Sequence, residues 1–152
     1  MKYSFKFNPQ LNENEIVIEH NADDQLITDL HQALAKQQRA HKTLKLFYND
    51  EQIFLNVNDI LFFETDNNKV YAHTNTYAYE SDYKLYELIE SLPEHFIRIS
   101  KSTICNTQYV LAISRYLSSS GTVKFKNSVK TVYVSRLFYN ELKASLEKRS
   151  LL

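Results

Sequence analysis

The residues of this sequence that could carry chemistry fall into two groups. The first group consists of histidines, carboxylates and one cysteine, and its spacing gives little support to catalysis. Five histidines are scattered along the chain, and no two have the i, i+4 spacing of a metal-binding pair on a helix. Glu64 and Asp66 end a strand pattern beside a turn, where two carboxylates are usually solvated. Cys105, the one cysteine, ends an apolar run and is expected to be buried. We therefore expect no enzymatic activity, no bound metal and no cofactor.

The second group consists of basic residues beside hydroxyl side chains. Lys101 lies between Ser100 and Ser102 at a break between two strand patterns, where these side chains can bind phosphate oxygens or reach a base edge. Arg136 follows Ser135, a suitable N-cap, in the first turn of a predicted helix. A helix N-terminus attracts phosphate, and an arginine can contact O6 and N7 of guanine together. The structural alternatives are an ordinary exposed turn and an ordinary surface arginine, although a cation at a helix N-terminus opposes the helix dipole and adds little stability there.

Composition and charge limit the remaining choices. The chain has 152 residues, enough for one domain or a domain with a short arm, and its single glycine excludes every glycine-rich phosphate loop. Residues 1–97 carry 8 basic and 16 acidic side chains, whereas residues 98–152 carry 10 basic and 2 acidic ones. This asymmetry favours a polyanionic partner for the second half, unless the two halves interleave and neutralise each other. No apolar run approaches the ~20 residues that cross a bilayer, and no signal peptide is recognisable, so we expect a cytoplasmic protein.

The first 43 residues are expected to form a short extension of two strands and a helix. Alternating aromatic and polar residues over Tyr3–Phe7 and the apolar run Ile16–Ile18 predict the strands. Asn21 is a candidate N-cap for the helix that follows. The apolar positions of this helix form one stripe: Leu26, Ile27, Leu30 and Leu34. The stripe needs a covering surface, either on a partner or on the rest of the chain.

Residues 44–152 are expected to form a mainly β domain with small helices. Turn signals such as Asn49-Asp50-Glu51 and Asp66-Asn67-Asn68-Lys69 separate short strand patterns, and Gly121 and Asn127-Ser128 supply further turns. The predicted strands are 44–48, 52–56, 60–65, 70–74, 77–80, 96–99, 103–105, 110–116, 122–126 and 129–134. One helix is predicted over 85–92, with Ser81 or Asp82 as its N-cap, and another after Ser135.

Together, these segments resemble the LytTR DNA-binding domain of bacterial transcription regulators. The resemblance extends from about Leu44 to about Lys148. Its parts are the strand Ile60–Glu64, the helix Leu85–Leu92, the signature Phe96-Ile97-Arg98-Ile99-Ser100-Lys101-Ser102-Thr103-Ile104-Cys105-Asn106 and the closing Val134-Ser135-Arg136. The resemblance implies an elongated LytTR-like β core with small helices, which binds double-stranded DNA at promoter repeats, mainly through loops in successive major grooves.

The resemblance also implies three DNA-contacting segments: the loop after the strand 60–65, the turn 100–102 and the start of the last helix. The corresponding candidates are Asn67, Asn68, Lys69, Ser100, Lys101, Ser102 and Arg136. Lys101 and Arg136 are the central ones, because they match the second and third contact regions of the family.

Two residues at the end of the signature are expected to be structural. Asn106 matches a family asparagine after the strand, and we expect its side chain to hold the following turn by hydrogen bonds to the backbone. Cys105 stands where the family usually has valine, in agreement with a buried side chain.

The chain departs from the family pattern at its front. Many of these regulators carry a receiver domain of roughly 120 residues, more than the 43 residues that precede the β domain here. The sequence resembles the subset in which the DNA-binding domain stands almost alone, often restrained by a membrane protein encoded nearby. We expect residues 1–43 to form an arm that mediates homodimerisation, at least on DNA, or binds such an inhibitor. The alternative is that the apolar stripe packs on the β core of the same chain.

Three functions are therefore compared. The first is a sequence-specific DNA-binding transcription regulator without enzymatic activity, and it accounts for the most observations. A protein-interaction module could use the 11 tyrosines, but tyrosine is common both at interfaces and in cores. RNA binding by aromatic stacking on a sheet ranks last, because no aromatic-Gly-aromatic motif is present.

Overall fold

The structure is a computed structural model that describes residues 25–40 and 43–149. The strands predicted at Tyr3–Phe7 and Ile16–Ile18 and the Asn21 cap lie outside these residues. The described helices are α1 (Gln25–Ala40), α2 (Leu85–Ser91) and α3 (Arg136–Glu147), with short 3-10 turns at Val57–Asp59 and Thr107–Tyr109. The strands are β1 (Thr43–Tyr48), β2 (Glu51–Asn56), β3 (Phe62–Asp66), β4 (Lys69–His73), β5 (Ala78–Ser81), β6 (Phe96–Ser100), β7 (Thr103–Asn106), β8 (Val110–Arg115), β9 (Gly121–Phe125) and β10 (Thr131–Val134).

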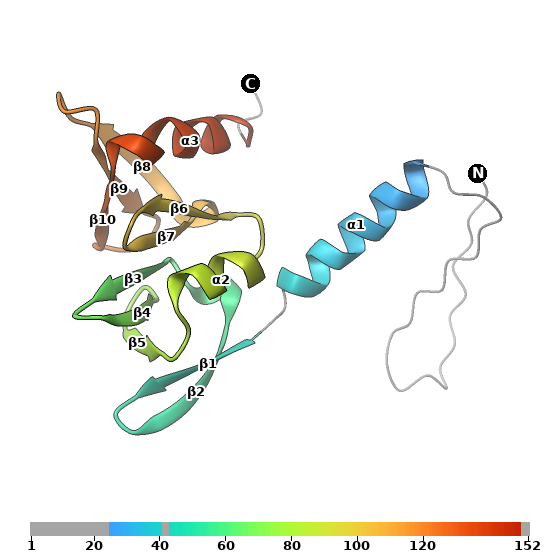
Figure 1. Cartoon of the computed structure of the whole chain (residues 1–152), viewed down its shortest axis with the longest axis horizontal. Helices are drawn as coiled ribbons and strands as arrows, with labels where there is room; N and C mark the ends of the chain where they lie inside the picture. The colour runs from blue at the N-terminus through green and yellow to red at the C-terminus, as the bar shows by residue number, and fades with distance from the viewer. Residues whose placement is uncertain (1–24, 41–42, 150–152) are drawn as a thin grey trace.

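The strands form two antiparallel sheets, which confirms the predicted mainly β fold. Seven strands run in the order β2-β1-β5-β4-β3-β7-β6, and three in the order β10-β9-β8. Figure 1 shows the two sheets one above the other, with α2 beside the larger sheet and α3 over the smaller one. Six of the nine connections between the described strands are short turns between neighbours in a sheet, so polar turn residues collect at the ends of the sheets.

Two of the hairpins close with two-residue turns. Asn49-Asp50 and Asn67-Asn68 all have positive φ, between 47° and 65°, as a type I′ turn requires. Asparagine and aspartate tolerate this left-handed conformation better than other residues that have a Cβ. Because Asp66 pairs with Lys69 in the ladder, the predicted four-residue loop at 66–69 is a tighter turn with only Asn67 and Asn68 at its tip.

Two hydrophobic clusters hold the domain together. One lies between the larger sheet and α2, and includes Leu46, Phe63 and Leu88. The other joins the larger sheet to the smaller sheet and α3, where Phe62 stacks on Phe125 with ring centroids 5.3 Å apart. The shared strand β3 therefore sends Phe63 into one cluster and Phe62 into the other, as the alternation of side chains along a strand dictates.

The predicted cap of α2 is wrong. Ser81 belongs to β5, and its hydroxyl accepts a hydrogen bond from the Tyr83 N–H at 3.1 Å. The helix begins at Leu85, and the Glu87 carboxylate accepts from the Lys84 N–H at 2.7 Å. The first turn is thus satisfied by a residue inside the helix, because the strand extends further than the sequence pattern indicates.

Gly121 was predicted to supply a turn, but it is the first residue of β9 and is buried. A Cβ at this position would lie 2.1 Å from the Ser114 carbonyl oxygen and 2.7 Å from the Tyr139 ring. The glycine therefore allows a close approach between β8, β9 and α3, and its φ is not positive.

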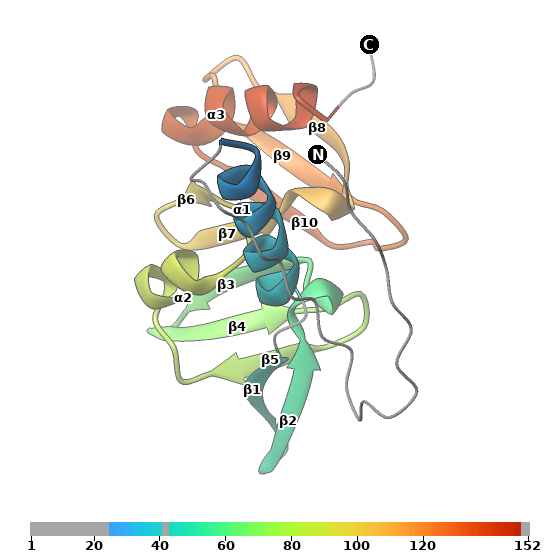
Figure 2. The same ribbon diagram turned by 90° about the vertical axis from the view of Figure 1, so that its right-hand side faces the viewer.

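The helix predicted before residue 43 is present as α1. Figure 1 shows α1 extending away from the two sheets, and Figure 2 views the molecule from the side on which α1 projects. Ile27 is buried and Leu30 and Leu34 are half-buried, but neither hydrophobic cluster includes them. Among the described helices, none combines the length and the apolar character needed to cross a membrane.

Candidate nucleic-acid interface

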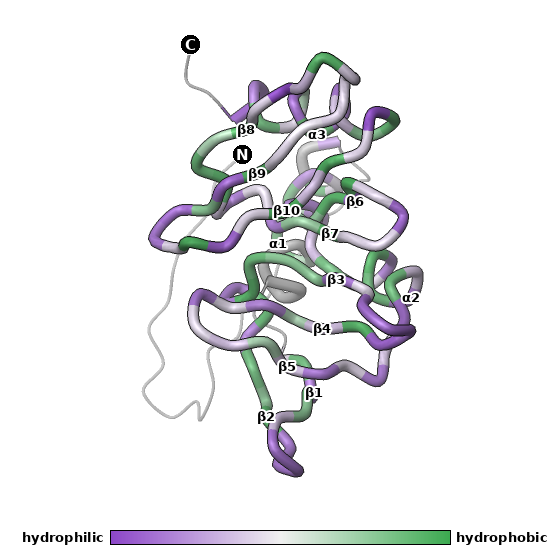
Figure 3. Tube along the Cα trace, turned by 90° about the vertical axis from the view of Figure 1, so that its left-hand side faces the viewer, coloured by the Kyte–Doolittle hydropathy of each residue, from purple (hydrophilic) through white to green (hydrophobic). Residues whose placement is uncertain are grey.

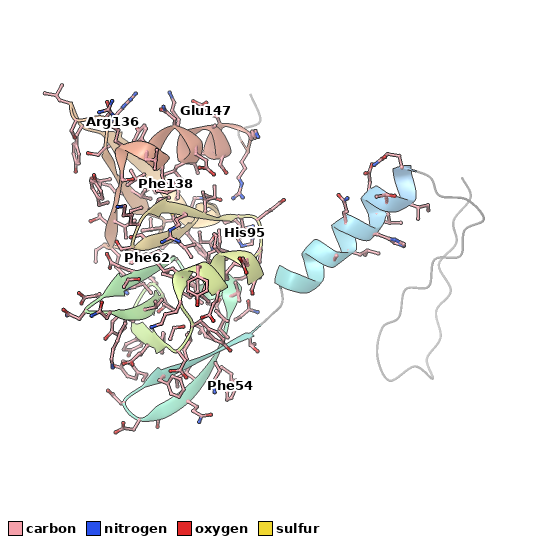
Figure 4. The ribbon with its side chains drawn as sticks, in the orientation of Figure 1. Phe54, Phe62, His95, Arg136, Phe138 and Glu147 are labelled. Carbon is pink, nitrogen blue, oxygen red and sulfur yellow. The ribbon has the colours of Figure 1, made fainter. Side chains whose placement is uncertain are left out.

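The three segments predicted to contact DNA lie along one edge of the domain. The end of β3 is next to the start of β7, because Glu64 pairs with Thr103, so the turns 67–68 and 101–102 are neighbours. Figure 3 looks onto this edge, where the strands are largely white to green and hydrophilic purple marks several hairpin tips. Figure 4 labels Arg136 at one end of α3 and His95 on the opposite side of the domain.

Backbone hydrogen bonds fix these segments to one another. The Thr65 N–H, at the end of β3, donates to the Ser102 carbonyl oxygen at 2.8 Å. The Ser135 N–H, just before α3, donates to the Ile99 carbonyl oxygen at 2.9 Å. The β6–β7 turn is therefore joined on one side to the β3–β4 hairpin and on the other to the start of α3. These bonds make the edge a single structural unit.

The turn at 100–102 has an internal network of hydroxyl groups. The Ser100 Oγ lies 3.3 Å from the Ser102 Oγ and accepts a hydrogen bond from the Ser102 N–H at 3.2 Å. Ser100 is buried, Ser102 is half-buried and Lys101 is exposed. Of the three, Lys101 is therefore best placed to reach a ligand, whereas the Ser100 hydroxyl is occupied within the turn.

Arg98, in the middle of β6, donates to the same turn. Its Nε donates to the Ser100 carbonyl oxygen at 3.1 Å, and its Nη2 makes a short hydrogen bond to the Lys101 carbonyl oxygen. Sequence reasoning included Arg98 in the signature but gave it no role. Its position three residues before Lys101 is the only sequence signal of this contact.

Arg136 is the first residue of α3, and its side chain is exposed. Ser135 is the N-cap residue, as predicted, but its hydroxyl makes no capping hydrogen bond. Its carbonyl oxygen accepts instead from the Phe138 and Tyr139 N–H groups, both at 3.1 Å. The helix terminus therefore presents an arginine and an uncommitted cap hydroxyl to the same edge.

Lys69 is exposed beside the Asn67-Asn68 tip, and it is already paired. Its Nζ lies 2.7 Å from the Glu80 Oε1, and this hydrogen bond and the charge of Glu80 raise the pKa of Lys69. Because both side chains are largely exposed, the pair contributes little to stability. A phosphate could therefore compete for Lys69 at small cost.

Glu64 and His73 form a polar pair on the adjoining face of the larger sheet. The His73 Nε2 lies 3.8 Å from the Glu64 Oε2. Burial, with a smaller effect from the charge of Lys130, lowers the pKa of His73 to about 4, so the imidazole is neutral at pH 7 and the pair is not an ion pair. Burial, and then the charge of Asp66, raises the pKa of Glu64. These groups line a hollow of about 340 Å³, and the ring of His73 stacks on Phe62 with centroids 4.2 Å apart.

The structural roles expected for Asn106 and Cys105 are present. Asn106 is fully buried, its Nδ2 donates to the Ile60 carbonyl oxygen at 2.9 Å, and its Oδ1 accepts from the Gln108 N–H at 3.1 Å. Cys105 is fully buried, and burial raises the pKa of its thiol to about 12. Both residues anchor β7, which carries the turn at 100–102 at its other end.

Two exposed lysines of the smaller sheet lie outside the three candidate segments and serve as a comparison for them. Lys124 and Lys126 are exposed, while the alternating Val123 and Phe125 are buried, because successive side chains of a strand point to opposite faces. The Lys126 Nζ donates to the Gln108 carbonyl oxygen at 3.1 Å.

Within residues 25–40 and 43–149, no group of three or more histidine, cysteine or acidic side chains could hold a metal ion.

The geometry defines a class of protein: a β-rich domain that brings an arginine, lysines and amide side chains from three segments to one edge. Such an arrangement suits recognition of nucleic acid through loops, without a helix lying in a groove. The comparison with family models identifies the class more closely. Residues 50–147 match the model described as the LytTr DNA-binding domain, and the chain belongs to this family.

Known proteins agree with this assignment. An uncharacterized HTH-type transcriptional regulator of Staphylococcus aureus strain MRSA252 is 36% identical over 101 residues, which cover 65% of this chain and 67% of the relative. A regulator of the same description from strain NCTC 8325 / PS 47 is 35% identical over the same coverage. A solved LytTr DNA-binding domain from Bacillus cereus superposes with a TM-score of 0.62 at 24% identity, covering 70% of this chain and 96% of the other. This last match supports the fold.

Proposed function

We propose that the protein is a sequence-specific transcription regulator that reads double-stranded DNA through the loops of one edge. Asn67, Asn68 and Lys69 would form one contact segment, the turn 100–102 a second and Arg136 a third. The loops would enter successive major grooves of promoter repeats, and the protein would act in the cytoplasm. It needs no catalytic residue or cofactor for this role.

One observation carries the proposal: the hydrogen bonds from Thr65 to Ser102 and from Ser135 to Ile99 join the three segments into one unit. Sequence readout requires side chains held at fixed separations, because a base contact that must first be ordered loses affinity. Lys101 and Arg136 are exposed on this unit, and each can form a bidentate contact with guanine or bind a phosphate.

The proposal is tested by selecting DNA from a random-sequence library with the full chain and then measuring fluorescence anisotropy. Binding to the selected sequence should survive scrambled competitor DNA and weaken steeply with salt, because neutralised phosphates release counterions. Arg136→Ala should cost about 1–3 kcal/mol, mainly at one base position. Lys124→Ala, which removes an exposed cation from the smaller sheet, is the matched control and should change affinity little.

Equal binding to selected and scrambled DNA would contradict sequence-specific recognition. If Arg136→Ala and Lys124→Ala weakened binding equally on every sequence, the basic half would act as a generic cationic surface. The protein-interaction function would then become the better explanation.

We propose further that residues 1–43 mediate homodimerisation, at least on DNA. The apolar stripe supports this, because Ile27, Leu30 and Leu34 belong to neither hydrophobic cluster of the β domain. Leu30→Asp combined with Leu34→Asp should halve the mass measured by light scattering, whereas Gln32→Asp on the exposed side of α1 should not. An unchanged mass in the double variant would exclude dimerisation through this stripe and leave an inhibitory membrane protein or packing within the same chain as the alternatives.

A further inference from the structure

We propose that Arg98 is a positioning residue for DNA recognition: its guanidinium group holds the β6–β7 turn in the conformation that presents Lys101. The inference rests on the proposed function and deepens it. Half-buried Arg98 would thereby contribute to sequence specificity, because it positions the side chain of Lys101.

The first step is the geometry of the guanidinium group. Arg98 Nε donates to the Ser100 carbonyl oxygen, and Nη2 donates to the Lys101 carbonyl oxygen. Two consecutive carbonyl groups of one turn are thus bound by the planar fork of a single side chain. Arginine is suited to this because its donors have a fixed geometry, whereas lysine offers a single ammonium group on a flexible chain.

The second step is the local need for such a clamp. The β6–β7 ladder has a register shift between Arg98 and Ser100, so a single pair, Ser100 with Thr103, lies between this irregularity and the turn. The turn also has no glycine or proline to favour one backbone conformation. Without the guanidinium group, the turn would keep the Ser100–Thr103 pair, the contacts of the Ser100 hydroxyl and the hydrogen bond from the Thr65 N–H.

The third step concerns charge. Among the described residues, the ion pairs Lys69–Glu80 and Lys143–Glu147 do not involve Arg98, and neither does the contact between neutral His73 and Glu64. The guanidinium group is bound by carbonyl oxygens and keeps its positive charge. That charge is hydrogen-bonded to the backbone carbonyl of exposed Lys101, at the edge expected to face DNA. A neutral amide side chain could also donate to a carbonyl oxygen, but it would bring no positive charge to the turn.

The consequence is preorganisation. If the turn samples other conformations, the apparent affinity falls by the fraction of molecules in the competent one. Binding to the selected sequence should suffer, because it needs Lys101 in one position. Binding to scrambled DNA should suffer less, because loose phosphate contacts tolerate a mobile side chain.

The experiment compares Arg98→Lys, which keeps the charge but loses the fork, with Arg98→Met, which loses both. Each full-length variant is measured by anisotropy on the selected and the scrambled DNA over a range of salt concentrations, with Lys101→Ala and Lys124→Met in parallel. Both Arg98 variants should lose about 10- to 100-fold in affinity for the selected DNA, the factor for losing hydrogen bonds from a charged donor. The salt dependence should be unchanged in Arg98→Lys, and its backbone amide NMR signals should shift mainly in residues 99–103.

Two results would overturn the inference. If Arg98→Lys bound like the wild type while Arg98→Met lost affinity equally on both DNAs, Arg98 would be a direct phosphate contact. If neither variant shifted the NMR signals of residues 99–103, the clamp would not hold the turn, whatever the DNA result. Failure of the wild type itself to distinguish the two DNAs would instead refute the proposed function, and the NMR comparison would still decide the role of Arg98 in the turn.

Discussion

Asn106 offers a sharp test of what holds the β domain together, because the chain contains a matched control. Asn106 and Asn56 each precede a 3-10 turn, and the side chain of each accepts a hydrogen bond from the N–H two residues later. They differ in one respect. Asn106 is fully buried and also donates to the Ile60 carbonyl oxygen, 46 residues away in sequence, whereas Asn56 is half-buried.

The expected magnitude follows from these contacts. Replacing either asparagine with leucine removes the cap, which typically costs ~1 kcal/mol of unfolding free energy. In Asn106→Leu the buried Ile60 carbonyl oxygen also loses its donor, and an unsatisfied buried group costs about 1–3 kcal/mol. We expect Asn106→Leu to lower the unfolding free energy by about 2–4 kcal/mol and Asn56→Leu by about 1 kcal/mol.

Urea unfolding followed by circular dichroism measures both values in the full chain. With a slope of roughly 1–3 kcal/mol per molar urea, the two midpoints should be clearly separated. If Asn106→Leu were within about 0.5 kcal/mol of Asn56→Leu, the long-range hydrogen bond would contribute nothing and the argument would be refuted. Folded Asn106→Leu protein should also bind DNA normally, because Asn106 holds the domain together and does not face the ligand.

Three other perturbations have definite expectations. Gly121→Ala should destabilise the domain by at least about 2 kcal/mol in the same urea assay, because the new Cβ would overlap the Ser114 carbonyl oxygen. A loss under about 0.5 kcal/mol would show that β8 and α3 can shift to make room for the Cβ. His73→Phe should reduce the loss of stability on acidification. Because the pKa of His73 is lowered to about 4 in the folded state, the unfolded state binds the proton more tightly between pH 6.5 and about 4. The unfolding free energy of the wild type therefore falls as the pH falls through this range, by about 2 kcal/mol near pH 4.5. Identical pH profiles for the variant and the wild type would exclude this coupling. Cys105 should react with a thiol reagent only at the rate of unfolding, because it is fully buried with a pKa of about 12, and fast reaction of the native protein would contradict its place in the second hydrophobic cluster.

Much of the fold follows from local patterns in the sequence. Turn residues between short strand patterns located the hairpins at 49–51 and 66–69, and the structure closes both with tighter, two-residue turns at Asn49-Asp50 and Asn67-Asn68. The buried position of Cys105 followed from its place at the end of an apolar run and from the family resemblance, which also indicated that Asn106 holds the following turn. The boundaries moved by one or two residues where strands continued into predicted loops, as at Lys69.

The errors and omissions have a common physical origin, which is contact between distant segments. Gly121 looked like a turn residue because only the packed Tyr139 ring and the Ser114 carbonyl oxygen reveal why a side chain is excluded there. The α2 cap was misplaced because pairing with β4 draws Ser81 into the sheet. The clamp made by Arg98 depends on the path of the turn after it, which a sequence pattern does not specify.

In the candidate site, too, local sequence patterns indicated some features and contacts between distant segments determined the others. The sequence and the resemblance supplied its residue types, but the structure supplied the hydrogen bonds from Thr65 and Ser135 that make three segments one edge. It also distinguished exposed Lys101 and Arg136 from Ser100, whose hydroxyl is buried within its turn.

The most direct test of the account is to map the DNA-binding surface on the intact chain by NMR. Amide signals of ¹⁵N-labelled protein would be followed while the selected DNA is added, with scrambled DNA as the control. The account predicts that the largest shifts specific to the selected DNA fall at residues 66–69, 99–103 and 135–138. Specific shifts centred instead on the β8–β9 hairpin, with those three segments unchanged, would contradict it.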